Sequence, residues 1–157
     1  MKHTIQVLVE NKFGVLARIA SLFSARGYNI NSLAVGETQD PTVSCMTIVV
    51  NAEDERVLEQ INKQLHKLID VITVVDFTRR DYVDRELVLL KVLKKEGARS
   101  ALDKLSKSSP LKISEEKDTF FIVEICDTHD SVEDILKEMK GLDIKEIVRT
   151  GKIAIGK

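Results

Sequence analysis

Residues 4–27 read TIQVLVENKFGVLARIASLFSARG, and the spacing of the apolar residues changes partway along this segment. Over residues 4–9 apolar and polar side chains alternate, which predicts a β-strand with one buried face. After a short polar break the apolar spacing becomes that of one stripe of an α-helix, formed by Leu16, Ile19, Ala20 and Phe23. Gly27 fits the position just past the end of a helix, where a positive φ is tolerated. The segment therefore predicts a strand, a turn and a helix.

The alternation of strands and helices continues beyond this segment. Strands are expected over residues 28–37 and 43–50, and the turn residues at 39–42 make the pair a hairpin. A helix is expected over residues 53–69 and a further strand over 71–78. The order βαββαβ is the ferredoxin-like arrangement. Such a unit buries one face of its sheet under both helices and leaves the other face free for a partner.

The same pattern begins again after a charged connector at residues 79–82. Further strands are expected over 86–93, 110–114, 119–125 and 144–155, the last of which Gly151 can break. Helices are expected around 98–105 and 132–139. We therefore expect an α+β chain of two tandem ferredoxin-like βαββαβ domains, at residues 1–79 and 84–157. The alternative is one continuous α/β domain.

Composition argues against nucleic acids and membranes as partners. The net charge is -1 and the aromatic content is 4% with no Trp, so the chain has neither an attractive global field nor side chains for base stacking. The N-terminus lacks the apolar core of a signal peptide, and no apolar stretch approaches the roughly 20 residues that span a bilayer. Cys45 and Cys126 lie in apolar runs and are expected to be reduced core thiols of a cytoplasmic protein.

The chain lacks the residue sets that support catalysis. Its histidines, His3, His66 and His129, are scattered without metal-ligand spacing. No serine lies in a nucleophile elbow, and the glycines are too isolated to cradle a phosphate. Arg18 is the arginine nearest to the first β–α loop, and we expect it to be a solvated helix residue. The sequence therefore predicts that the chain is not an enzyme and holds no metal or cofactor.

The turn after the first strand offers a place for a small anionic ligand. Gly14 directly precedes a helix expected to begin at Val15, and the first N–H groups of a helix have no internal partners. Gly14 has no Cβ to keep a carboxylate away from them. Asn11 can both donate and accept, which suits an amino group and a carboxylate together. The alternative is that Asn11 caps the helix and Gly14 only makes the turn.

Several segments resemble one protein family. Residues 9–19 (VENKFGVLARI) and 22–30 (LFSARGYNI) are similar to an ACT domain. Residues 58–68 (LEQINKQLHKL) narrow the resemblance to the small regulatory subunits of acetolactate (acetohydroxyacid) synthase. Residues 85–92 and 146–151 resemble the second half of that family.

The resemblance implies a non-catalytic subunit that associates with a thiamin-diphosphate-dependent large subunit of branched-chain amino-acid biosynthesis. It would raise the activity of that subunit and confer feedback inhibition, usually by valine, with leucine or isoleucine as the other candidates. The resemblance further implies a homodimer through the ACT domains, with the effector between the β–α loop of one copy and the second strand of the other. Carried onto this sequence, the effector-binding residues would be Asn11, Gly14, Val15, Leu16, Asn29 and Ile30.

The second half departs from the family at residues 106–112, where the family has a longer helix and an Arg-Gly segment. The role of this half therefore stays open. A stand-alone ACT-domain sensor that regulates another partner is the alternative function.

Overall fold

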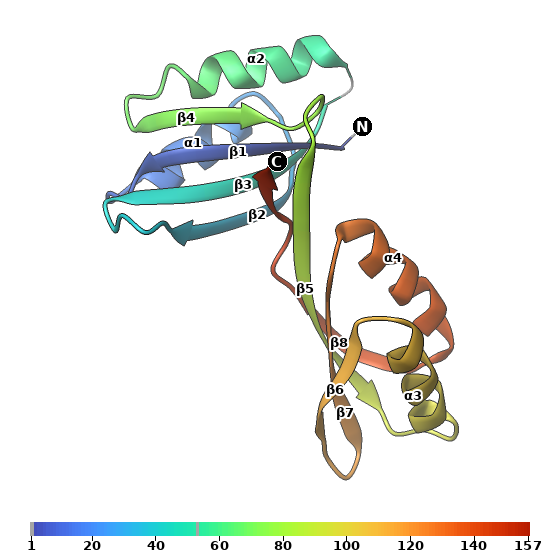
Figure 1. Ribbon diagram of the computed structural model, residues 1–157. Helices are drawn as coiled ribbons and strands as arrows, with labels where there is room; N and C mark the ends of the chain where they lie inside the picture. The colour runs from blue at the N-terminus through green and yellow to red at the C-terminus, as the bar shows by residue number, and fades with distance from the viewer. Residues whose placement is uncertain (1, 53) are drawn as a thin grey trace. The chain divides into compact units, whose positions relative to one another are not determined.

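The computed structural model describes residues 2–52 and 54–157, and the chain divides into two compact units (Figure 1). The first unit contains the residues up to Val83 together with Lys152–Lys157. The second unit contains Asp84–Gly151. Each unit is described by itself below.

The first unit consists of strands and helices in the order βαββαβ. Its elements are β1 (Lys2–Glu10), α1 (Val15–Ser24), β2 (Ile30–Glu37), β3 (Val43–Asn51), α2 (Glu55–Leu65) and β4 (Val71–Asp76). The strands form an antiparallel sheet in the order β2-β3-β1-β4, so β2 and β4 are its edges. Helix α2 is shorter than the predicted 53–69, and residue 53 lies outside the described residues. The Asp54 side chain caps α2 by accepting a hydrogen bond from the Val57 N–H at 3.0 Å.

The core of the first unit lies between its sheet and its two helices. The alternating residues Ile5, Val7 and Val9 of β1 are completely buried. They pack in one cluster with the apolar stripes of both helices, which include Ile19 and Phe23 of α1 and Ile61 and Leu65 of α2. Burying each such side chain contributes about 1.5–3 kcal/mol. The apolar stripes of α1 and α2 both pack on the same face of the sheet. This packing holds the first turn of α1 at the carboxyl end of β1.

The second unit repeats this arrangement. Its elements are β5 (Tyr82–Leu93), α3 (Ala98–Ser108), β6 (Leu111–Glu116), β7 (Phe120–Asp127), α4 (His129–Glu138), the short 3-10 helix η1 (Met139–Gly141) and β8 (Ile144–Arg149). The sheet order is β6-β7-β5-β8. Its core is made by alternate residues of β5 and β7 with the stripes of α3 and α4. The prediction of an α+β chain with two ferredoxin-like units is thereby confirmed.

The C-terminal segment does not continue β8. Gly151 has a φ of 78° and breaks the strand predicted over 144–155, so that a separate strand, β9 (Ile153–Gly156), follows and pairs with β5. The Gln6 side chain donates to the Ala154 carbonyl at 2.8 Å, and the Lys157 N–H donates to the Asp81 carbonyl at 3.1 Å. The last six residues therefore pack with the first unit.

Both cysteines are free thiols, but the prediction that they lie in the core is wrong. Cys45 is half-buried and Cys126 is exposed. In β7 the buried side chains Val123 and Ile125 face the helices, and the next residue of a pleated strand faces the other way. Among the described residues, no helix is long and apolar enough to cross a membrane.

Candidate functional site

The loop between β1 and α1 is built around a glycine in the left-handed region. Gly14 has a φ of 80° and is the N-cap residue of α1, without a side-chain cap. The Asn11 amide instead donates to Glu37 Oε1 at 3.1 Å and to the Pro41 carbonyl at 2.9 Å. The alternative that Asn11 caps the helix is therefore wrong. Asn11 ties the loop to the end of β2 and to the β2–β3 hairpin.

Several N–H groups at the start of α1 remain available. The Val15 N–H donates to the Lys12 carbonyl at 3.3 Å, and the Arg18 N–H donates to the Gly14 carbonyl at 3.0 Å. Within the part of the chain that the structure describes, the N–H groups of Gly14, Leu16 and Ala17 have no acceptor. Donors clustered at the positive end of a helix are suited to a carboxylate.

The side chains beside these donors differ in their exposure. Val15 is buried in the core, with 2% of its surface exposed, so that only its backbone faces the loop. Leu16 is 44% exposed and offers an apolar surface next to the free donors. Of Val15 and Leu16, both among the effector-binding residues that the resemblance implies, only Leu16 thus has an accessible side chain.

Arg18 is an exposed residue of α1, as expected, but its guanidinium is also paired with a carboxylate. Its Nε and Nη2 both lie 2.8 Å from Oδ2 of Asp70, a carboxylate that is almost fully buried. A Cβ added to Gly14 would lie 3.2 Å from Arg18 Nη1, so the guanidinium also rests against the glycine. Sequence reasoning missed this pair because Asp70 lies 52 positions further along the chain.

The other half of the predicted site lies at the opposite end of the sheet. Ile30, at the start of β2, pairs with Val50, which pairs with His3 at the beginning of β1. Asn11 follows Glu10 at the far end of β1. Seven residues of strand separate the two ends, which corresponds to about 23 Å. One chain therefore does not bring Asn11 and Gly14 together with Asn29 and Ile30.

Charges around the loop are locally paired. Lys12 Nζ lies 2.7 Å from Glu10 Oε2, and this hydrogen-bonded carboxylate raises the pKa of Lys12. In the hairpin, the hydroxyl and N–H of Thr42 donate to Asp40 and lower the pKa of its carboxyl group. Lys12 and Glu10 therefore offset each other's charge, whereas the neutral donors of Thr42 favour the charged form of Asp40.

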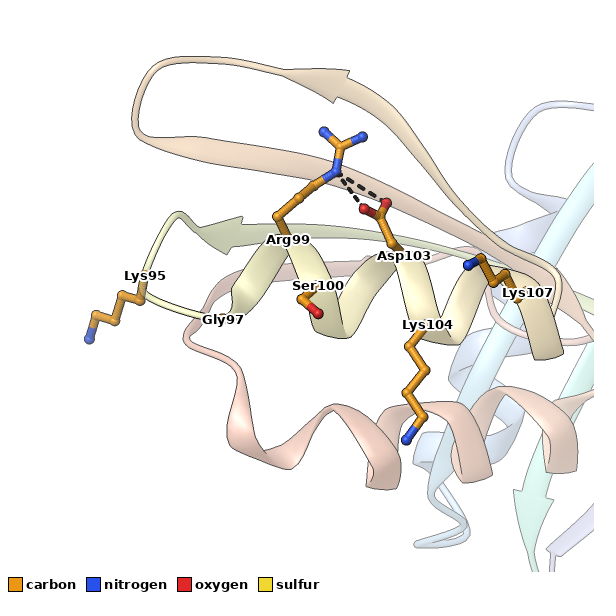
Figure 2. A pocket seen from close by; sticks show the side chains of 7 residues that line it. All are labelled: Lys95, Gly97, Arg99, Ser100, Asp103, Lys104 and Lys107. Atoms are coloured by element: carbon orange, nitrogen blue, oxygen red, sulfur yellow. Dashed lines mark hydrogen bonds and ion pairs between the residues drawn. The ribbon is translucent and has the colours of Figure 1, made fainter.

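A hollow on α3 in the second unit carries a different set of side chains. Figure 2 shows that it is lined by Lys95, Gly97, Arg99, Ser100, Asp103, Lys104 and Lys107. Arg99 is paired with Asp103 and with Glu116, and Lys95 is paired with Asp143. The hollow is thus an exposed helix face whose charges are partly paired with neighbouring side chains. None of the residues that line it has an amide side chain like that of Asn11.

The second unit also contains a buried carboxylate. Glu86 is 3% exposed and binds Arg149 Nε at 2.7 Å and His129 Nδ1 at 2.7 Å. Burial raises the pKa of Glu86, but the hydrogen bonds from Arg149 and His129 outweigh it and hold the pKa below its ordinary value. The cluster joins β5, α4 and β8, so it holds these elements of the second unit together.

Comparison with known proteins covers both units. A family model described as an AHAS small subunit-like ACT domain matches residues 5–73, and one described as the small subunit of acetolactate synthase matches residues 85–157. The chain is 45% identical over 155 residues to a probable acetolactate synthase small subunit of Archaeoglobus fulgidus, covering 99% of this chain and 96% of the relative. It is 44% identical over 158 residues to the acetolactate synthase small subunit of Mycobacterium leprae, covering 99% and 91%.

Solved structures agree with this. The crystal structure of the acetolactate synthase small subunit from Thermotoga maritima superposes with a TM-score of 0.89 at 33% identity, covering 100% of this chain and 98% of that one. The match runs through both units, so the departure at residues 106–112 does not remove the second half from the family. The chain belongs to the family of acetolactate synthase small subunits and carries an ACT domain in its N-terminal half.

Proposed function

We propose that this chain is the non-catalytic regulatory subunit of an acetolactate synthase. In this role it activates a thiamin-diphosphate-dependent large subunit and confers feedback inhibition by valine, with leucine or isoleucine as the other candidate effectors. Residues 1–79 are the effector-binding ACT domain and residues 84–157, of which the last six pack with the first unit, a second ACT-like domain. The names of the relatives support the association with a catalytic subunit. The lack of a catalytic residue set in the sequence is consistent with a regulatory role.

The observation that carries the proposal is the separation of the two halves of the site by the length of the sheet. Strand β2 is an edge strand, and an antiparallel pairing of β2 with β2 of a second copy is isologous. Such a pairing would bring the start of one β2 beside the end of the other. Asn29 and Ile30 of one copy would then face Asn11 and Gly14 of the other. A homodimer therefore explains why one chain carries two half-sites.

In this dimer each group of an amino acid has a matching protein group. The free N–H groups of Gly14 and Leu16 would hold the carboxylate at the helix terminus. Asn11 and Asn29 supply amide oxygens for the ammonium group. The Leu16 side chain, which is 44% exposed, and the accessible part of Ile30, which otherwise packs against the core, supply apolar surface for a branched side chain. Binding at a junction of two copies can shift the populations of conformations that the catalytic partner senses.

The test is a calorimetric titration of valine into the full-length protein and two matched variants. Gly14→Asp places a side chain and a negative charge where the effector carboxylate belongs. Gly97→Asp makes the same change at the corresponding glycine of the second unit, with nearly the same φ and therefore the same backbone strain. We expect Gly14→Asp to weaken valine binding by at least about 100-fold, and Gly97→Asp to leave it within about two-fold. Equal binding by all three proteins would overturn the proposed site.

A second measurement separates this function from a stand-alone sensor. Acetolactate formation by the cognate large subunit is assayed with and without this chain across a valine titration. Activation in the absence of valine and inhibition in its presence are expected. No effect of the chain at any valine concentration would favour the sensor.

A further inference from the structure

Two large apolar side chains are almost completely exposed at one end of the first unit. Phe13 is 101% exposed and Ile69 is 95% exposed. Phe13 lies in the β1–α1 loop and Ile69 in the turn before β4. The Glu10 N–H donates to the Asp70 carbonyl at 2.9 Å, which holds that turn against the end of β1. Both side chains therefore belong to the same end of the sheet, and we call them the loop-end surface.

The fold does not require these exposed side chains, because the second unit makes the same backbone arrangement without them. There the Leu93 N–H donates to the Asp143 carbonyl at 2.9 Å, which matches the bond between Glu10 and Asp70. Glu96 stands directly before the helix-capping glycine, in the place of Phe13. Leu142 stands before Asp143, in the place of Ile69, and is partly buried against the core. Almost complete exposure of large apolar side chains at this end of the sheet is thus particular to the first unit, and such groups mark contact surfaces.

The loop-end surface is also connected directly to the proposed effector loop. Arg18 binds Asp70, the neighbour of Ile69, through Nε and Nη2, and its Nη1 rests against Gly14. A ligand that moves the backbone at Gly14 would therefore press on the guanidinium that positions the turn carrying Ile69. Phe13 is the residue next to Gly14 and moves with the loop itself.

We propose that the loop-end surface is the contact through which this chain binds the catalytic subunit, an inference that rests on the proposed function. In the proposed dimer the copies pair through β2, whereas the turn carrying Ile69 leads into β4, the other edge of the sheet, so a second copy is the less suitable occupant at Ile69. Lys12, next to Phe13, is paired with Glu10, and Asp70, next to Ile69, is paired with Arg18. The partner therefore presents an apolar socket with a neutral surround, and added salt has little effect on the association.

The experiment measures binding of the large subunit to the full-length chain and to three serine variants by surface plasmon resonance, at low and high salt. Phe13→Ser and Ile69→Ser remove the exposed side chains. Val148→Ser is the control, because Val148 is 57% exposed in the second unit. We expect affinity for the large subunit to fall about 10–100-fold for Phe13→Ser and several-fold for Ile69→Ser, with no change for Val148→Ser. Valine binding by Ile69→Ser and the melting temperatures of all variants are expected to match the wild type.

Two results would overturn the inference. One is unchanged affinity of both Phe13→Ser and Ile69→Ser for a large subunit that binds the wild-type chain. The other is a change in self-association of Phe13→Ser, seen by sedimentation, with intact binding of the large subunit, because the surface would then join two copies of this chain. If the wild-type chain binds neither the large subunit nor valine, it is the proposed function that fails.

Discussion

The β1–α1 loop and the β5–α3 loop have the same backbone arrangement but differ in almost every side chain. Gly14 and Gly97 have φ values of 80° and 78°, and each accepts a helical hydrogen bond of 3.0 Å, from Arg18 and Ala101 respectively. Both loops also make the same backbone hydrogen bond three residues before the glycine. The Asn11 N–H donates to the Thr42 carbonyl, and the Lys94 N–H donates to the Thr119 carbonyl. The backbone of the loop is thus a property of the fold.

The side chains of the two loops differ at the positions around the glycine. The first loop has Asn11 bound to the end of β2, an exposed Phe13 and an arginine behind its glycine. At the place of Asn11 the second loop has Lys94, which is paired with Glu116 at 2.7 Å. At the place of Arg18 it has Ala101. A helix terminus with free N–H groups therefore occurs in both units, whereas an amide, an exposed aromatic ring and an arginine surround only the first of them.

The opposite ends of the two sheets differ as well. His3 of β1 and Glu86 of β5 each lie seven residues before the last residue of their strand, and both are buried. His3 has one hydrogen bond, from or to Thr78 Oγ1 at 3.0 Å, and its Nε2 has no partner among the described residues. Glu86 has partners on both oxygens. The second unit therefore depends on an ionic cluster at a position where the first unit does not.

The largest expected effect is on the stability of the second unit. Glu86→Ala leaves Arg149 without its buried partner and should lower the free energy of unfolding by about 3 kcal/mol at neutral pH. Since the folded-state pKa of Glu86 is lowered, its contribution is complete above the unfolded pKa of about 4.3 and is lost as the pH falls through the folded pKa. Urea unfolding at about pH 7 and about pH 3.5 should therefore show a smaller penalty at the lower pH.

His3→Ala is the matched control for that prediction. It removes a single side-chain hydrogen bond to Thr78 and should cost about 1 kcal/mol beyond the lost packing. A penalty for Glu86→Ala that is independent of pH would contradict the role of the ionic cluster.

The next effect is on ligand binding. Asn11→Lys puts into the first loop the residue type that the second loop has, and it should weaken valine binding about 10–100-fold by removing the amide and its tie to β2. The reverse change, Lys94→Asn, should create no second binding event in the same calorimetric titration. A second event in Lys94→Asn would mean that the backbone and one amide suffice for a site.

The smallest expected effect is a difference in stability between alanine variants of Gly14 and Gly97. Alanine at either position is strained by the positive φ and should cost about 1 kcal/mol. At Gly14 the new Cβ would also lie 3.2 Å from Arg18 Nη1, whereas nothing lies within 4 Å at Gly97. We expect Gly14→Ala to be more destabilising by a few tenths of a kcal/mol, measured by urea unfolding. Equal values would mean that the guanidinium moves aside freely.

Much of the fold could be predicted from local patterns. The alternation at residues 4–9 and the helical stripe from Leu16 to Phe23 each depend on a period of a few residues, and both elements formed where expected. Cys126 was placed wrongly because its apolar neighbours were counted as a run instead of an alternation. The N-cap of α4 is Thr128, whose hydroxyl accepts from Ser131 N–H. Helix ends of this kind depend on one or two residues and are harder to locate than helix stripes.

Spacing within single segments was enough to predict the two βαββαβ units and the start of the first helix after Gly14 with its free N–H groups. Only the tertiary structure decided which side chains meet across segments. It brought Arg18 to Asp70, tied Asn11 to Glu37 and returned the last strand to the first unit. It also placed Asn29 and Ile30 at the far end of the sheet from Gly14, because β1 and β2 run in the same direction on either side of β3. That strand direction is a long-range property of the sheet, and it is the reason why the effector site needs two chains in our proposal.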